Sequence, residues 1–263
     1  MTEIIFYPLL IIFPLALLVG PVGSILVWRR SSFLSDVVSH MGILAFAVAE
    51  VMHLPLLLVS VCVSMLTAFL LEWSPSFIPK DAWLSGLSSF GIAVGLILLS
   101  QKGGYNFDHV FWGDMFALSF VDVIVCVIAV GFLGMHLIAF WKSLMLVIFH
   151  EQLAVLDGIP VRFLKIVVSL ISGVVIALCL KLMGVLLTGA LFVVPSIGLR
   201  FFNMTPERHI TGTIILITLS FLGGLFVSIS TDIIATPLII LTLIILNFGV
   251  LLIKKGIDRK RKK

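Results

Sequence analysis

Long stretches without a charged side chain divide this chain, and they constrain its fold more than any other feature. A transmembrane α-helix needs about 20 consecutive apolar residues. Only 11% of the residues are charged and 61% are hydrophobic, against about 25% and 45–50% in soluble domains. These values exclude a secreted disulfide scaffold, a disordered chain and a free nucleic-acid binder. Five charge-free stretches have at least 20 residues: Ile4–Trp28, Val51–Leu71, Ala82–Gln101, Ile210–Thr231 and Ile233–Ile253.

Two further spans are less regular. Val123–Trp141 is charge-free over 19 residues and suffices to cross. Val37–Ala49 is shorter, and it needs its polar neighbours Asp36 and Glu50 to complete a helix. We therefore expect an all-α polytopic membrane protein.

The apolar region around Lys181 contains enough residues for two crossings. Ile166–Leu180 precedes this lysine and Leu182–Leu199 follows it, with Gly184 as the turn signal. Two short spans fit better than one very long helix. The sequence thus predicts about nine transmembrane helices, and eight helices plus a re-entrant segment is the alternative.

The distribution of basic residues predicts the orientation. With nine crossings and an external N-terminus, 15 Lys and Arg residues fall inside and only Lys102 and Lys181 fall outside. Short cytoplasmic loops carry such an excess of Lys and Arg. We expect one transmembrane domain over residues 1–263, with a cytosolic basic tail at 254–263 that sets orientation and contacts anionic lipid.

Motifs that bind nucleotides or perform hydrolysis are absent from the sequence. It has no GxxxxGK[ST] loop, no GxSxG and no HExxH, the motifs expected of common nucleotide sites and hydrolases. We expect no enzymatic activity. Energy for uphill transport would come from an ion gradient or from a partner chain.

Ionisable side chains gather in the second predicted span. Asp36 and His40 are four residues apart and share a helical face, and Glu50 extends the same stripe with His53 to one side. Carboxylate and imidazole suit Zn²⁺, Mn²⁺ or Fe²⁺. Asp36 and His40 are therefore candidate metal ligands, and Glu50 and His53 are weaker ones. The alternatives are a hydrogen-bonded Asp–His pair and polar groups at the outer interface.

Three other histidines carry less information. His136 is alone in an apolar helix, where a hydrogen-bonded histidine within the bundle is the expectation. His150 and His209 fall in predicted inner loops.

The inner loop after the fifth span predicts a short helix. Glu151, Ala154 and Gly158 have an E-x-x-A-x-x-x-G spacing, and Pro160 follows the glycine. Such a helix is either an interfacial anchor or a docking element for another protein.

Several motifs, in order along the chain, resemble those of the zinc/manganese ABC-transporter permease family. Gly20–Ala49, with GPVGSILVWRRSSFLSDVVSH, resembles the family's N-terminal signature. Phe111–Ser119 is similar to its FGD element, residues 149–161 to its cytosolic PExAxxxG loop, and Gly184–Phe202 to its LLxxALLVxPAxxAR span. MTPERH and STDIIATP fit as well, so the resemblance covers nearly the whole chain.

The resemblance implies the permease of a type II ABC importer in a bacterial inner membrane. It implies two permease copies, two cytosolic ATP-binding subunits and an external solute-binding protein. No nucleic-acid partner is expected, because orientation and lipid contact explain the basic tail. Asp36 and His40 would line the metal route, and Glu151, Ala154 and Gly158 would form the coupling segment on the ATPase. The transported ion would be Zn²⁺, or alternatively Mn²⁺ or Fe²⁺, and no cofactor would be bound permanently.

A different class of function also remains open from the residues. A stand-alone secondary carrier could be driven by protons through Asp36, Glu50 and His136. A membrane scaffold without transport activity is a more distant possibility. Both would work without the ATPase partner.

Overall fold

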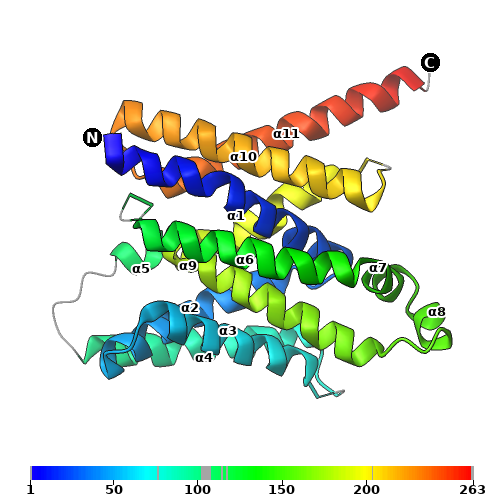
Figure 1. Cartoon of the computed structure of the whole chain (residues 1–263), viewed down its shortest axis with the longest axis horizontal. Coiled ribbons are helices and arrows are strands. Elements are labelled where there is room, and N and C mark those ends of the chain that lie inside the picture. The colour runs from blue at the N-terminus through cyan, green and yellow to red at the C-terminus, as the bar shows by residue number, and fades with distance from the viewer. Residues whose placement is uncertain are drawn as a thin grey trace.

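The described part of the chain is entirely helical (Figure 1). A computed structural model describes residues 2–75, 77–101, 108–113, 115–116, 118–202 and 204–261. These residues contain no strand, which confirms the all-α prediction. The helices are α1 (Thr2–Trp28), α2 (Phe33–Met52), α3 (Leu56–Glu72), α4 (Lys80–Ser100), α5 (Asp108–Trp112), α6 (Phe120–Ala139), α7 (Trp141–Phe149), α8 (Glu151–Leu156), α9 (Val161–Arg200), α10 (Pro206–Thr231) and α11 (Ala235–Arg261).

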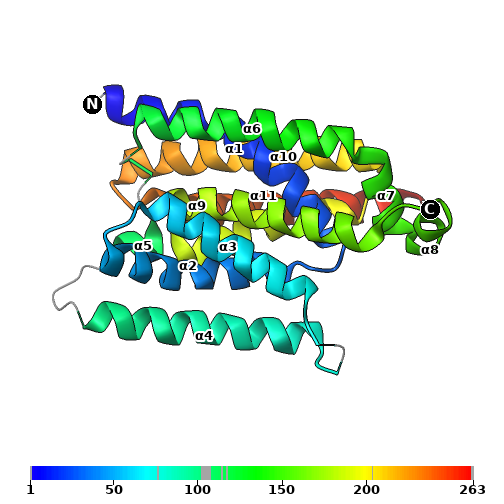
Figure 2. The ribbon, with the colours of Figure 1, turned by 60° about the horizontal axis from the view of Figure 1, so that its bottom comes forward.

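Helix α9 is the centre of the bundle. It packs against α1, α2, α3 and α11. Helix α2 lies between α9 and α4, and α4 forms one edge of the molecule (Figure 2). Helices close their backbone hydrogen bonds internally, as a chain in hydrocarbon requires.

Both ends of α9 lie beside the C-terminal end of α1. The Arg29 Nη1 is 3.2 Å from the Ser169 Oγ, near the start of α9. The Ser24 and Ser196 hydroxyl oxygens are 3.3 Å apart, near the end of α9. Because Ser169 and Ser196 are at the same end of the bundle, α9 must reverse direction between them.

The reversal occurs at Gly184. Leu182, just before it, lines a small cavity with Ile11 near the start of α1, so the turn lies at the opposite end of the bundle. Gly184 has φ 67° and ψ 176°, a conformation that is essentially restricted to glycine. Its α-carbon also faces backbone atoms of Phe111 and Gly113 at close range. The two-segment prediction around Lys181 is therefore confirmed.

The number of spans agrees with the expected nine when this reversal is included. Seven of the described helices are long and apolar enough to cross a membrane, and α9 is one of them. The reversal divides α9 into two segments, and the apolar α3 has 17 residues. Counted in this way, the described chain has nine apolar helical segments, of which α3 is shorter than the seven helices long enough to cross.

The boundary between the second and third spans differs from the prediction. Helix α2 has 20 residues instead of the 13 of Val37–Ala49, and α3 starts at Leu56 instead of Val51. His53 is left-handed, with φ 54°, and the Leu54 N–H donates to the Ala49 carbonyl, so the backbone leaves the helix here. Pro55 is the N-cap of α3, where its missing N–H costs no helical hydrogen bond.

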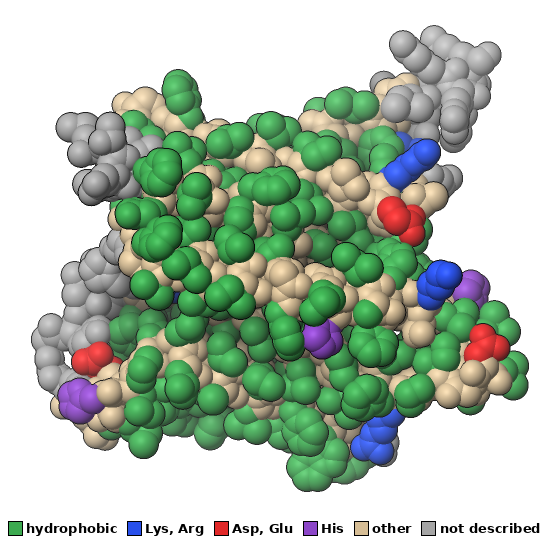
Figure 3. Space-filling view, in the orientation of Figure 1, with side chains coloured by type: hydrophobic (Ala, Val, Ile, Leu, Met, Phe, Trp, Pro, Cys, Tyr) green, Lys and Arg blue, Asp and Glu red, His purple; other side chains and the backbone are tan. Residues whose placement is uncertain are grey.

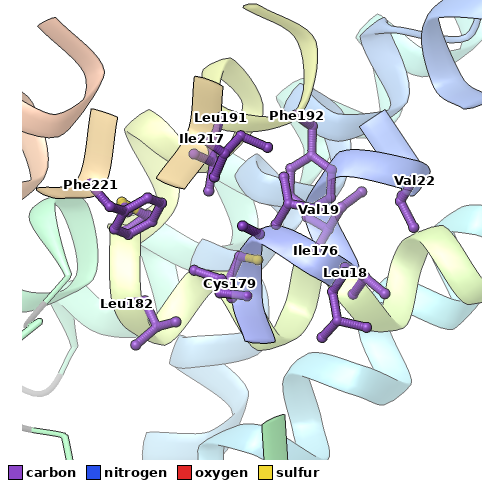
Figure 4. Packing of buried hydrophobic residues seen from close by; sticks show 14 of the residues in the cluster. Leu18, Val19, Val22, Ile176, Cys179, Leu182, Leu191, Phe192, Ile217 and Phe221 are labelled. Carbon is purple, nitrogen blue, oxygen red and sulfur yellow. The ribbon is translucent and has the colours of Figure 1, made fainter. Parts of the chain in front are cut away.

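The core is formed by α1, α9 and α10. Phe192 and Phe221 are fully buried, and they pack in one cluster with Val19, Ile176 and Ile217 (Figure 4). The outer surface is apolar as well. Hydrophobic side chains cover the middle of the molecule, while most visible charged side chains lie towards its two ends (Figure 3). This pattern is expected of a bundle surrounded by lipid.

Candidate functional site

Asp36 lies on the first turn of α2, against the second half of α9. Its carboxylate contacts Gly189 so closely that it occupies the space of a Cβ at that position. The neighbouring Ser35 hydroxyl is 3.4 Å from the Gly189 carbonyl oxygen. Glycine at this position therefore lets Asp36 and α9 approach each other.

His40 lies one turn further along α2 and contacts α4. Its Nδ1 is 2.7 Å from the Ser88 hydroxyl oxygen. When Nδ1 carries the proton and donates to Ser88, Nε2 is the unprotonated nitrogen that a metal ion binds. Such a hydrogen bond fixes both the tautomer and the ring orientation of a ligating histidine.

Asp36 and His40 share an accessible strip of α2. Both side chains are half-buried, while Val37, Val38 and Ser39 between them are buried. The Asp36 carboxylate is also within electrostatic reach of His40. Because they are four residues apart, the two side chains share one face of α2, with Asp36 towards α9 and His40 towards α4. Such a small ligand set can release an ion as well as bind it, which conduction requires.

The weaker candidates are at the other end of α2. Glu50 follows Asp36 by 14 residues, which is about 21 Å along a helix. His53 is exposed and forms the left-handed C-cap of α2. Within the described residues, no group of three or more His, Cys, Asp and Glu side chains could hold a metal. The structure thus brings Asp36 and His40 together and leaves Glu50 and His53 apart from them.

The predicted short helix in the inner loop is α8. Glu151 Oε1 is 2.6 Å from the Lys165 Nζ, which ties the start of α8 to α9. Ala154 is fully buried and packs with Val147 of α7 and Leu164 of α9. Gly158 ends the segment with φ 71°. The three residues therefore define one compact unit held against the start of α9.

Helix α8 also presents an apolar surface. It lies at the far end of the molecule, beyond the long helices (Figures 1 and 2). Leu153, Val155 and Leu156 are 51%, 61% and 81% exposed. Exposed apolar side chains grouped at one place are typical of a surface that contacts a membrane or another protein.

A buried ion pair lies at the same end of the bundle and was missed by sequence reasoning. Glu72 Oε1 accepts hydrogen bonds from Arg29 Nη2 and Ser169 Oγ, each at 2.6 Å. The pair joins the ends of α1 and α3 to α9. Arg29 is in the family signature, but its partner is 43 residues away and no local pattern identifies it.

Two histidines have clear structural positions. His136 Nδ1 is 2.8 Å from the Phe132 carbonyl oxygen, on an exposed face of α6. Helix α6 packs against α1 and α9, so the fold separates His136 from the strip on α2. His209, expected in a loop, is instead buried in the first turns of α10.

Several sequence relatives of this chain are named as membrane components of metal transport systems. The high-affinity zinc uptake system membrane protein ZnuB of Buchnera aphidicola subsp. Schizaphis graminum is 28% identical over 229 residues, 84% of this chain and 87% of the relative. ZnuB of Haemophilus influenzae is 27% identical, covering 92% and 94%. The manganese transport system membrane protein MntC of Halalkalibacterium halodurans is 23% identical, covering 67% and 62%.

Structural and family comparisons agree with these relatives. PsaBC from Streptococcus pneumoniae, solved in complex with a Fab, includes a chain with the same fold. The TM-score is 0.84 at 21% identity, over 94% of this chain and 90% of that chain. The ABC 3 transport family matches residues 1–254. The resemblance found from the sequence motifs is therefore confirmed, and this multi-pass membrane chain belongs to the ABC 3 transport family.

Proposed function

We propose that this chain is the permease of an ATP-driven importer of divalent transition-metal ions, with zinc as the expected ion. The observation that carries the proposal is the Asp36–His40 pair on the accessible strip of α2. Two relatives named for zinc uptake match most of the chain, and a relative named for manganese transport matches part of it. Manganese and iron(II) are the alternative ions.

Asp36 and His40 would contact the ion during its passage. Two protein ligands leave most coordination positions of a transition metal to water or to a second set of ligands. In a homodimer, the same pair from the partner subunit would supply that second set. Ser88 and Gly189 would keep the two side chains in position.

Helix α8 would connect this permease to a separate cytosolic ATP-binding subunit. Its exposed leucines and valine offer a surface for that subunit, and the Glu151–Lys165 ion pair ties the segment to α9. Because α9 packs against both α1 and α2, a displacement of α8 would be transmitted through α9 to α2, the helix that carries Asp36. ATP hydrolysis itself would take place on the partner.

The membrane orientation follows from the two ends of the bundle. The end with α8 carries Arg29, Arg30 and Arg200 and would face the cytosol. The opposite end, with the turn at Gly184, would face outwards and receive the ion from an external solute-binding protein. The N-terminus would be outside and the C-terminus in the cytosol of a bacterial inner membrane.

Uptake of radioactive zinc and manganese tests the proposal. The chain would be expressed with its ATP-binding subunit and solute-binding protein in cells that lack their own importers. We expect ATPase-dependent uptake of zinc that collapses in His40→Ala. His136→Ala is the matched control, because it removes an imidazole from α6 instead of α2, and it should transport normally.

Other results would revise this function in defined ways. Uptake of manganese instead of zinc would keep the mechanism and change the ion. ATPase-dependent uptake with wild-type kinetics in His40→Ala would remove the pair from the route. Uptake without the ATPase would overturn the importer and favour a stand-alone carrier.

A further inference from the structure

A second cavity lies far along the bundle from the turn at Gly184, at the end that carries α8. It has a volume of about 620 Å³ and opens between the ends of α1, α7 and α9 and the start of α10. This volume is within the range of about 300–1,000 Å³ that is typical of sites for small organic ligands. Asp36 and His40 do not line it.

The charged groups in the wall of this cavity are basic. Arg30 and Arg200 both line it, and none of its described lining residues is acidic. Lys254 lies close by, with its Nζ 5.5 Å from the centre of the Phe202 ring, which is also in the wall. Two guanidinium groups in one cavity wall attract an anion.

The guanidinium groups of Arg30 and Arg200 do not tie helices together. Among the described residues, neither guanidinium has a hydrogen-bond or ion-pair partner. The adjacent Arg29 provides the contrast, because its guanidinium is bound to Glu72 and Ser169. Arg29 and Arg30 are adjacent in the chain, but only the Arg29 side chain holds helices together.

The backbone at Arg30 adds an independent observation. Arg30 has φ 55°, and it follows the end of α1 with the hydrogen bonds of a Schellman motif: its N–H donates to the Val27 carbonyl, and the Ser31 N–H to the Leu26 carbonyl. Glycine is the usual residue at this left-handed position. An arginine is present here although glycine would be less strained, and it lines the cavity.

Aromatic side chains form much of the remaining wall, and several of them pack on one another. Trp28 packs on His209 with ring centres 5.2 Å apart, and on Phe149 at 5.7 Å. His209 is itself held at both ring nitrogens, with Nε2 3.1 Å from the Ser196 carbonyl oxygen and Nδ1 3.2 Å from the Ser24 hydroxyl. The cavity therefore has a rigid apolar side next to its two free guanidinium groups.

We propose that this cavity binds a phosphate ester, with the phosphate at Arg30 and Arg200 and its organic part against Trp28 and Phe149. Guanidinium groups match phosphate oxygens with paired hydrogen bonds, and the aromatic wall suits the carbon atoms attached to them. Two sources share this chemistry, the headgroup of an anionic phospholipid and a soluble phosphate ester. Basic pockets between transmembrane helices are known places for lipid headgroups.

Binding to the purified full-length chain in detergent tests the proposal. The probes are short-chain phosphatidylglycerol, short-chain phosphatidylcholine and glycerol 3-phosphate, and binding is followed by native mass spectrometry and by thermal unfolding. We expect phosphatidylglycerol to bind more tightly than phosphatidylcholine. Arg30→Gln and Arg200→Gln should each weaken its binding at least about tenfold, the effect of losing a hydrogen bond to a charged group.

Arg162→Gln is the matched control. It removes the same charge from an exposed position on α9, at the same end of the bundle but outside the cavity wall. It should bind the probes like the wild type. Arg30 and Arg200 are both exposed, so either variant should fold, and unchanged unfolding without probe would verify this.

Each of the other outcomes either supports or overturns the phosphate-ester site. Glycerol 3-phosphate binding that needs Arg30 and Arg200 would support the site and assign it to a soluble phosphate ester. Equal binding of all probes, or equal losses in Arg30→Gln and Arg162→Gln, would overturn the proposal. The site does not depend on the transported ion, so failure of the uptake experiment would leave this test unaffected.

Discussion

Gly189 determines how Asp36 is presented. The carboxylate fills the space that any side chain at position 189 would need. The glycine on α9 therefore sets the position of the Asp36 carboxylate on α2. His40 depends on Ser88 in a similar way, through the 2.7 Å contact with its Nδ1. At this scale, the candidate metal pair is positioned by partners on two other helices.

Gly189→Ala is therefore expected to impair transport. The added methyl group must displace the Asp36 carboxylate, and disturbing the surroundings that orient a metal ligand typically costs about 10–100-fold in affinity or activity. Uptake of the metal ion at several concentrations measures the effect. Gly86→Ala in α4, where a Cβ meets open space, is the control, and wild-type kinetics in Gly189→Ala would contradict this role.

At the scale of elements, the turn at Gly184 allows one continuous helical stretch to serve as two spans. Its backbone conformation and its contact with Phe111 and Gly113 exclude a side chain. The turn returns α9 to the end where Ser196 meets Ser24. Without it, residues 185–200 could not lie between α1 and α2.

Gly184→Ala should destabilise the folded protein. A residue with a side chain in this conformation costs about 1–3 kcal/mol, and the clash with the α5 region adds to that cost. Thermal unfolding in detergent and the yield of folded protein measure the loss. Gly131→Ala in α6 has open space around its Cβ and should be at least as stable as the wild type, because Ala is favoured over Gly within a helix. Equal stability of the two variants would refute the argument.

Helix α8 is the second element with a predicted role, which is to couple ATP hydrolysis on the partner to uptake. Glu151→Lys would bring two positive charges together at Lys165, and Gly158→Leu would place a side chain at φ 71°. We expect either change to separate ATP hydrolysis from uptake while the permease stays in the membrane. The assay compares ATPase activity and uptake in the same vesicles.

The control for this experiment is Gly256→Leu, at an exposed position of α11 without neighbours around its Cβ. It should leave uptake and ATP hydrolysis coupled. Normal transport in both Glu151→Lys and Gly158→Leu would show that α8 does not transmit the effect of ATP.

At the scale of the whole molecule, the nine apolar segments give the bundle two chemically different ends. The end with α8 carries Arg29, Arg30 and Arg200, and the end with the Gly184 turn carries Lys181, which is paired with Asp122 at 2.7 Å. Positive charges remain on the cytosolic side during insertion. The charge distribution therefore predicts which end faces the cytosol.

Labelling of single cysteines tests this orientation. In a variant without Cys62, Cys126 and Cys179, an impermeant maleimide should modify Asp232→Cys in intact cells. It should modify Asp157→Cys only after the membrane is opened, because both positions are exposed but lie at opposite ends of the bundle. The reverse pattern would invert the proposed topology, and labelling of both in intact cells would contradict the number of crossings.

Local patterns in the sequence sufficed for much of the architecture. Charge-free lengths identify the spans because the bilayer requires about 20 apolar residues per helix, and the Lys181 and Gly184 signals identified the reversal. The boundary at Pro55 was misplaced, since charge-free length alone extends a span through a turn of uncharged residues. The Asp36–His40 pair could also be predicted from the sequence, because residues four apart share a face in any helix.

The sequence by itself thus determined an all-α membrane bundle, its family and one pair of neighbouring candidate ligands. Only the tertiary structure decided that Ser88 and Gly189 position this pair, that Glu72 engages Arg29, and that Arg30 remains free beside a basic cavity. The physical reason is the separation along the chain of the residues that interact. Helix periodicity and hydrophobic length act between residues close along the chain, whereas these contacts join residues that become neighbours only when the helices pack.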